Sequence, residues 1–228
     1  MRRSHHSQAR GRRWLVVLTA LVAALAASVA AQEPAPELEI APEIISPFLR
    51  IKSPEGHFPR LLGELSPPRG DSWHQVGKQG GSWHVMAPRD LPLDAEQAGS
   101  RLMRVALRQD PRPPRPVLSL HVHPTQEGEP TAFTPEIADE YIRRYLNQGI
   151  AQQVIEKTDS GLVSRGALRF AMVVGAYTQG AQKMRHAHFA FYSPSRQFYI
   201  RFDCADDEWA AYQSIVGQIF LSFYPEGP

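Results

Sequence analysis

The stretch Met184–Cys204, MRHAHFAFYSPSRQFYIRFDC, decides the fold of this chain. Two runs of alternating apolar and polar residues flank Ser193–Arg196, a segment with the serine and proline content of a turn. If these four residues form the turn, Tyr192 pairs with Gln197, and antiparallel geometry then sets every other pair. The stretch therefore predicts a β-hairpin with one defined register.

That register gives each face of the hairpin its own chemistry. A slip of one residue would mix the two faces, so their agreement favours this register. The apolar face pairs Phe189 with Ile200 and Phe191 with Phe198, and the polar face pairs His186 with Asp203 and His188 with Arg201.

Two more strands, Val154–Thr158 and Leu168–Thr178, are predicted before the hairpin. The second strand is apolar on both sides, with Phe170 and Met172 on one side and Val173 on the other. Neither face of a sheet that contains such a strand can be wholly exposed to water. We therefore expect a layer of structure on each side of the sheet.

The preceding part of the chain is also predicted to be mainly β. Ser72–Val76 and Ser82–Met86 are short aromatic and β-branched runs around the glycine-rich Gly77–Gly81, which indicates a second hairpin. Val117–His123 alternates as a strand does. Arg101–Arg108 fits either a strand or a helix opened by a capping box, and its alternation favours the strand.

Two helices complete the pattern. Thr134 followed by Pro135 is typical of a helix start, and this helix should run to about Gln148. Its apolar stripe consists of Ile137, Tyr141, Ile142, Tyr145 and Leu146. Asp206 or Asp207 should cap a second helix, which is expected to dock on the sheet. Together the elements predict an α+β fold in which helices flank an antiparallel β-sheet. The apolar face of the second helix consists of Trp209, Tyr212, Ile215, Val216, Ile219, Phe220 and Phe223.

The first 31 residues have the organisation of a signal peptide. An apolar segment, Trp14–Ala27, precedes Ser28–Ala31, the small-residue pattern that a signal peptidase accepts. We expect residues 1–31 to be cleaved, which leaves no membrane anchor and places the protein in the periplasm or outside the cell. The alternatives are an uncleaved anchor and export of the folded protein through the twin-arginine pair. The positively charged segment that precedes Trp14 contains five arginines, Arg2, Arg3, Arg10, Arg12 and Arg13, and the last two form the twin-arginine pair.

The rest of the chain is predicted to consist of a linker and one domain. Residues 32–46 are rich in Pro, Glu and Ala, as extended linkers are, and residues 47–228 are expected to form a single domain. Loss of the leader lowers the Lys and Arg count from 25 to 20 against 23 Asp and Glu, so the mature charge is about −3. This balance excludes a basic surface for nucleic acid. The one cysteine, Cys204, alternates with apolar residues and is predicted to be buried.

The order of elements and two motifs resemble the PsbP-like superfamily. The motifs are the aromatic strand Phe198–Phe202 and a closing helix that runs from Asp207–Trp209 to Ile219–Phe223. The resemblance covers residues 130–225, with a looser fit over residues 46–125. The resemblance implies an α/β/α sandwich. It also implies a binding or docking role, because members of the superfamily share no set of catalytic residues. It therefore assigns no site residues.

Two histidine pairs are candidate metal ligands. His121 with His123, and His186 with His188, each place two imidazoles on one strand face, a spacing that can chelate Zn²⁺ or Cu²⁺. Because the second pair should lie in the middle strand of a meander, the first pair would be at least two strands away, about 9.6 Å. A joint four-histidine site is disfavoured, and ordinary structural roles are the competing interpretation. No cofactor is predicted.

The pair of His186 and Asp203 supports a hydrolase hypothesis, since a carboxylate can orient an imidazole as a general base. Such a mechanism also needs a nucleophile within reach of His186. Ser164 does not have the spacing of a nucleophile elbow. The alternative is a satisfied polar pair beneath a loop or helix.

Trp73 and Trp83 are the candidate residues for binding a ligand or partner, because exposed tryptophans near a hairpin tip are typical anchors. His74 and His84 belong to the same candidate site, since they face each other if the glycine-rich loop closes symmetrically. The alternative is that both tryptophans pack beneath long loops.

These observations predict an exported, non-enzymatic binding or adaptor domain whose partner is an envelope protein or a small ligand. A periplasmic zinc- or copper-binding protein is the first alternative. A hydrolase that uses the histidine and aspartate pair is the second.

Overall fold

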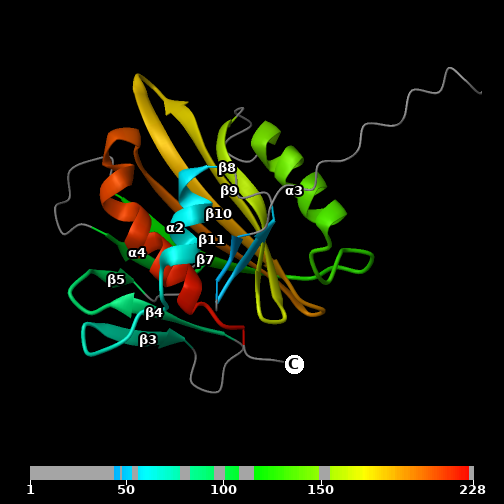
Figure 1. Cartoon of the computed structure of the whole chain (residues 1–228), viewed down its shortest axis with the longest axis horizontal. Coiled ribbons are helices and arrows are strands. Elements are labelled where there is room, and N and C mark those ends of the chain that lie inside the picture. The colour runs from blue at the N-terminus through cyan, green and yellow to red at the C-terminus, as the bar shows by residue number, and fades with distance from the viewer. Residues whose placement is uncertain are drawn as a thin grey trace, which may run out of the picture. The chain divides into compact units, whose positions relative to one another are not determined.

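A nine-stranded antiparallel sheet runs through the described part of the chain (Figure 1). The computed structural model describes residues 44–46, 48–52, 56–77, 83–94, 101–107, 116–148 and 155–225, which belong to the unit Ala41–Pro228. A separate hairpin contains β3 (Trp73–Gly77) and β4 (His84–Pro88). The order across the main sheet is β1 (Ile44–Ile45), β2 (Arg50–Lys52), β8 (Glu156–Arg165), β9 (Leu168–Gln179), β10 (Gln182–Tyr192), β11 (Arg196–Ala205), β7 (Val117–Pro124), β6 (Arg101–Ala106) and β5 (Leu93–Asp94).

Helices cover both faces of this sheet (Figure 1). On one face, α3 (Pro135–Gln148) packs against β8 and β9. On the other face lie α2 (His57–Glu64) and α4 (Trp209–Ser222), which contact each other. The β3–β4 hairpin packs beside α4. The predicted α+β class, with a layer on each side of an antiparallel sheet, is confirmed.

The predicted register of the central hairpin is confirmed, with Tyr192 opposite Gln197 and both faces paired as expected. β9 pairs with the other edge of β10, so β10 is the middle strand of a meander. The strands predicted at 101–108 and 117–123 are observed as β6 and β7. β8 is longer than predicted, because it continues through Gly161 to Arg165.

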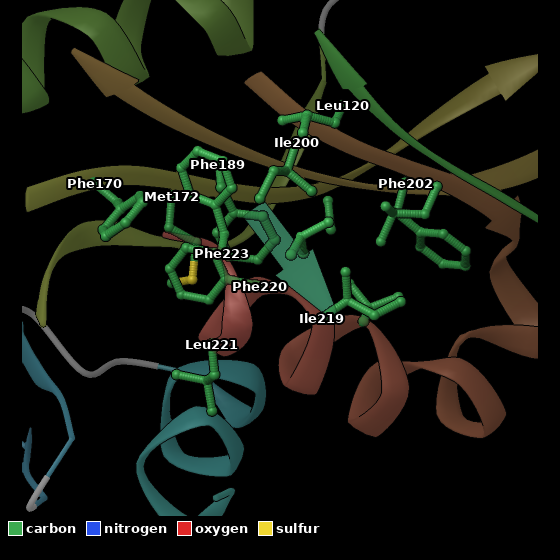
Figure 2. Packing of buried hydrophobic residues seen from close by; sticks show 14 of the residues in the cluster. Leu120, Phe170, Met172, Phe189, Ile200, Phe202, Ile219, Phe220, Leu221 and Phe223 are labelled. Atoms are coloured by element: carbon green, nitrogen blue, oxygen red, sulfur yellow. The ribbon is translucent and has the colours of Figure 1, made fainter. Parts of the chain in front are cut away.

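The main core fills the space between the sheet and α4 (Figure 2). The ring of Phe189 stacks on Phe220 of α4 with centroids 4.0 Å apart, and Phe170 meets Phe220 edge-on at 4.9 Å. Phe58 of α2 lies against Phe189 at 6.2 Å. Cys204 is fully buried as predicted, and burial raises the pKa of its thiol to about 12.

α2 is absent from the sequence prediction because its start is stabilised by a residue distant in sequence. Asp159 of β8 is buried, and its carboxylate accepts a hydrogen bond of 3.2 Å from the N–H of Phe58. Gly56 has a φ of 106°, and a Cβ there would fall 1.3 Å from that carboxylate. At the other end, Gly217 lets α4 approach α2, since a Cβ there would lie 2.6 Å from Leu65.

One predicted boundary is corrected by the sheet. β1 (Ile44–Ile45) lies inside the predicted linker 32–46, because Ile44 pairs with Ile51 of β2. The predicted leader, residues 1–31, lies outside the described residues. In the part of the chain that is described, no helix is both long and apolar enough to cross a membrane.

The acidic residues before α4 do not cap it as predicted. α4 begins at Trp209 after a 3₁₀ turn, Asp206–Glu208, and no side-chain cap is formed. The carboxylate of Asp206 instead accepts a hydrogen bond from Arg185 of β10 at 2.7 Å. Asp206 therefore connects the start of the helix to the sheet.

Candidate functional site

A layer of histidine and tyrosine side chains separates α3 from the sheet. The phenol of Tyr141 lies 2.6 Å from Nε2 of His188, and the phenol of Tyr145 lies 2.9 Å from Nε2 of His186. The two tyrosines are one helical turn apart on α3, and the two histidines share one face of β10. The predicted apolar stripe of the helix thus includes two hydroxyl groups that meet the polar face of the hairpin.

His186 lies in the middle of a hydrogen-bonded chain. Its Nδ1 is 2.8 Å from Oδ1 of Asp203, which also accepts a hydrogen bond of 3.2 Å from Tyr177. When Nδ1 donates to this carboxylate, Nε2 accepts from the hydroxyl of Tyr145. The predicted pairing of His186 with Asp203 is confirmed, and so is its position beneath a helix.

His188 is also held by stacking. Its ring lies 4.1 Å from that of Tyr145, with an angle of 14° between the planes, and 5.7 Å from that of Tyr199 on β11. Burial lowers the pKa of His188 well below its ordinary value, and positive charge on His186, Arg201 and His121 lowers it further. This imidazole therefore stays neutral.

The same burial limits what Tyr145 can do chemically. Its hydroxyl occupies the position that a nucleophile would need beside His186, a feature that the sequence prediction missed. Burial raises the pKa of Tyr145 above its ordinary value, and the carboxylate of Asp203 also raises it, although Arg201 lowers it. The phenol is therefore stabilised in its protonated form, as a hydrogen-bond donor.

The other predicted histidine pair lies on β7, next to β11 and two strands from β10, as expected. Nε2 of His121 is 3.1 Å from Oγ of Ser119, and the exposed ring of His123 meets Tyr199 edge-on at 5.5 Å. In the described residues, no group of three or more His, Cys, Asp and Glu side chains could hold a metal ion. Metal binding by either pair stays a prediction.

The predicted hairpin is observed, but it does not assemble the four-residue site. Trp83 is 5% exposed, which is too little for a surface anchor, and Trp73 is half-buried against the main core. The register places His84 opposite Gly77 and His74 opposite Ala87, so the two histidines do not face each other. The symmetric closure of the loop was the wrong assumption.

His84 is engaged by the C-terminal segment instead. Its backbone forms a β-bridge with Tyr224, with hydrogen bonds of 2.8 Å in both directions, and the two rings stack at 5.3 Å. The alternative interpretation, in which the tryptophans pack rather than bind, therefore fits Trp83.

A cavity of about 720 Å³ lies at one end of the sheet, where the β8–β9 and β10–β11 turns are neighbours (Figure 1). The segment before α3 and Pro225, after α4, complete its wall. Its volume is within the range of small-molecule pockets, about 300–1,000 Å³. The apolar part of the wall comes from Phe133, Leu168, Phe191, Tyr192, Phe198 and Pro225.

Two arginines also line this cavity, Arg169 at the start of β9 and Arg196 at the start of β11. Both side chains are exposed, and neither makes an ion pair within the described part of the chain. The described residues that line the cavity include no carboxylate. Sequence reasoning missed this site because its wall combines turns that are far apart in the chain.

A third arginine, Arg165, connects this end of the sheet to α4 by hydrogen bonds. Its guanidinium donates hydrogen bonds to the carbonyl oxygens of Leu221 and Phe223, at the end of the helix. Cationic side chains at a helix C-terminus satisfy its free carbonyl groups. The β8–β9 turn, which forms part of the cavity wall, is thereby fixed to the helix.

Comparison with known proteins identifies the fold. No protein-family model and no curated protein sequence matches the chain. Among solved structures, cyanobacterial PsbP (CyanoP) from Synechocystis sp. PCC 6803 is similar with a TM-score of 0.51 and 10% identity, over 72% of this chain and 99% of that one. LpqN of Mycobacterium tuberculosis, a protein involved in cell envelope biogenesis, is similar with a TM-score of 0.52 and 14% identity, over 68% and 91% of the two chains. The chain therefore has a PsbP-like fold.

Proposed function

We propose that this protein is an exported, non-enzymatic binding domain whose small ligand occupies the cavity between the hairpin turns. The observation that carries the proposal is the cavity itself, about 720 Å³ with a largely aromatic and aliphatic wall. Concave sites with apolar walls and a few polar groups are typical of ligand pockets. A small ligand is favoured over an envelope protein because the site is a hollow.

Export is supported by the sequence and agrees with one structural relative. The arginine-rich start, the apolar segment and the small residues before Gln32 form the pattern of a cleaved leader. LpqN, which shares the fold, is involved in cell envelope biogenesis. Mass spectrometry of the protein from its producing cell should find the N-terminus at Ala31 or Gln32, and recovery of intact Met1 in the membrane fraction would contradict export.

A binding role is favoured over hydrolysis because burial holds the phenol beside His186 in its protonated form. The chain from Tyr145 through His186 to Asp203 has the order of a catalytic triad, but burial raises the pKa of the phenol. A protonated phenol is a poor nucleophile. The hydrogen bonds of this layer are explained by the need to satisfy polar groups removed from water.

The experiment blocks the cavity without entering the core. Ala167 lines the cavity and is exposed, so Ala167→Trp should fill the space while the fold is kept. Small apolar and amphiphilic compounds are screened by their effect on the melting temperature. A ligand present at a hundredfold excess over its Kd stabilises the folded state by about 2.7 kcal/mol.

We expect some of these compounds to stabilise the wild type and the control Ala210→Trp, whose substitution lies on the exposed side of α4. None should stabilise Ala167→Trp. Equal stabilisation of all three proteins, or of none, would contradict the proposed site.

A further inference from the structure

We infer that the ligand of this cavity is a single-chain anionic amphiphile, whose acidic head group pairs with Arg169 and Arg196 while its apolar chain fills the cavity. The inference rests on the proposed function, because it presupposes that the cavity binds a small molecule. It adds the charge and shape of that molecule.

The charge follows from the side chains that line the site. Arg169 and Arg196 are exposed, have no ion-pair partner in the described residues, and share the cavity with no described carboxylate. The carboxylate of Glu129, on the loop before α3, accepts a hydrogen bond of 2.8 Å from the side chain of Gln197 and is not part of the wall. Two uncompensated guanidinium groups beside an apolar wall favour a carboxylate or phosphate over a neutral or cationic group.

The positions of the two arginines agree with one shared site. Arg169 precedes Phe170, which pairs with Phe191, and Arg196 precedes Gln197, which pairs with Tyr192. The two arginines therefore flank the end of β10 from its two neighbouring strands, about 10 Å apart along the sheet. Both line the cavity, so a head group held at the turn has a guanidinium group on each side.

The shape follows from the volume and the wall. A cavity of about 720 Å³ suits a molecule of drug-like size, which corresponds to one hydrocarbon chain rather than a two-chain lipid. Its apolar wall includes the partly exposed Leu168, Tyr192 and Pro225, with the buried rings of Phe133, Phe191 and Phe198 behind them. Burial of a chain against apolar side chains favours binding in proportion to the area removed from water. The head group then selects by charge.

The test compares four probes that share one chain and differ in the head group. Dodecanoate, dodecyl phosphate, dodecanol and dodecyltrimethylammonium are titrated into the full chain by calorimetry, below their critical micelle concentrations. We expect both anions to bind about tenfold more tightly than dodecanol, because exposed ion pairs contribute only modestly to affinity. The preference should shrink at high salt because the charges are exposed.

Arg169→Gln/Arg196→Gln should remove the preference for anions and leave dodecanol binding unchanged. The matched control is Arg60→Gln/Arg104→Gln, which removes two exposed arginines outside the cavity and should keep the preference. Shifts in the amide resonances of Ala132, Ala167 and Ser193 should locate the bound anion at the cavity. If the preference for anions depends on only one of the two cavity arginines, the result still supports an anionic ligand.

The outcomes separate this inference from the proposed function. Equal binding of dodecanol and dodecanoate, or tighter binding of dodecyltrimethylammonium, overturns the anionic ligand but leaves the cavity as a binding site, provided that Ala167→Trp abolishes binding. Resonance shifts centred elsewhere overturn both. Absence of binding by all four probes overturns the amphiphile, and the compound screen then decides the proposed function separately.

Discussion

The two faces of the central sheet use the same strands to build opposite kinds of interior. Phe189 and Phe191 of β10 point toward α4, into a core of aromatic rings, whereas His186 and His188 point toward α3. The pleat alone produces this separation, because successive side chains of a strand lie on opposite faces. One strand therefore supports a non-directional apolar contact on one side and a directional polar contact on the other.

The difference shows how the two helices are held. Apolar burial stabilises α4 in proportion to the area removed from water and tolerates small shifts. The layer under α3 works through hydrogen bonds whose loss leaves buried polar atoms without partners. We expect the α4 side to dominate stability and the α3 side to define the position of its helix.

The largest effect should come from the apolar side. Phe220 is fully buried and contacts both Phe170 and Phe189, so Phe220→Ala should lower the free energy of unfolding by about 3–5 kcal/mol. Denaturant unfolding followed by circular dichroism measures this change. A loss below about 0.5 kcal/mol, the range of exposed sites, would show that α4 does not pack as described.

A smaller loss is expected from the polar side. Tyr145→Phe removes the donor to Nε2 of His186 and leaves that nitrogen buried, which should cost about 1–3 kcal/mol in the same measurement. Tyr224→Phe, at a tyrosine that is 50% exposed, is the matched control and should be nearly neutral. Equal effects at both positions would remove the distinction between the two faces.

The polar side should also make stability depend on pH. The pKa of His188 is lowered in the folded protein, so below about 6.5 the unfolded chain binds a proton that the folded chain does not. This contribution to stability is complete above that pH and is lost as the pH falls toward the folded-state pKa, by up to about 1.4 kcal/mol per pH unit. Unfolding at pH 7.5 and pH 5.5 should show a weaker pH dependence for His188→Gln than for the wild type. His123→Gln, at an exposed site, should keep the wild-type dependence, and an unchanged dependence in His188→Gln would contradict the neutral state of that ring.

The smallest effect is expected on β7, where His121 and His123 lie at the edge of the polar face. Removing both side chains in His121→Ala/His123→Ala should change the melting temperature little, and equally in EDTA and in added zinc or copper. Substitutions at such sites usually stay within about 0.5 kcal/mol. A metal-dependent rise in melting temperature that the double variant abolishes would instead favour the metal-binding alternative.

Local alternation was sufficient to predict the central hairpin but not the side chains of α3 that contact it. The pairing of His186 with Asp203 follows from sequence, since a short turn leaves one register that keeps both faces consistent. That Tyr141 and Tyr145 would reach those histidines depends on where α3 crosses the sheet, which no local pattern specifies. The periodicity of α3 indicated an apolar stripe, but it did not predict what the hydroxyl groups of Tyr141 and Tyr145 would contact.

Contacts between distant segments explain the remaining differences. α2 depends on Asp159 of β8 for its N-terminal hydrogen bond, and Arg165 satisfies the carbonyl groups of α4, so neither interaction has a local signal. The hairpin containing Trp83 was recognised from composition, whereas its burial follows from packing beside α4. The cavity also has no local sequence signal, because its wall forms only where turns that are distant in the sequence meet.

The composition of the cavity wall sets when during the life of the protein a ligand can first bind. The wall requires the segment before α3, the β8–β9 and β10–β11 turns and Pro225, so it is incomplete until synthesis has passed residue 225 and the sheet has closed. A chain that crosses a membrane unfolded would carry no site during its passage. Loading would then take place only in the compartment of arrival, and the local supply of ligand there would decide whether the protein is occupied.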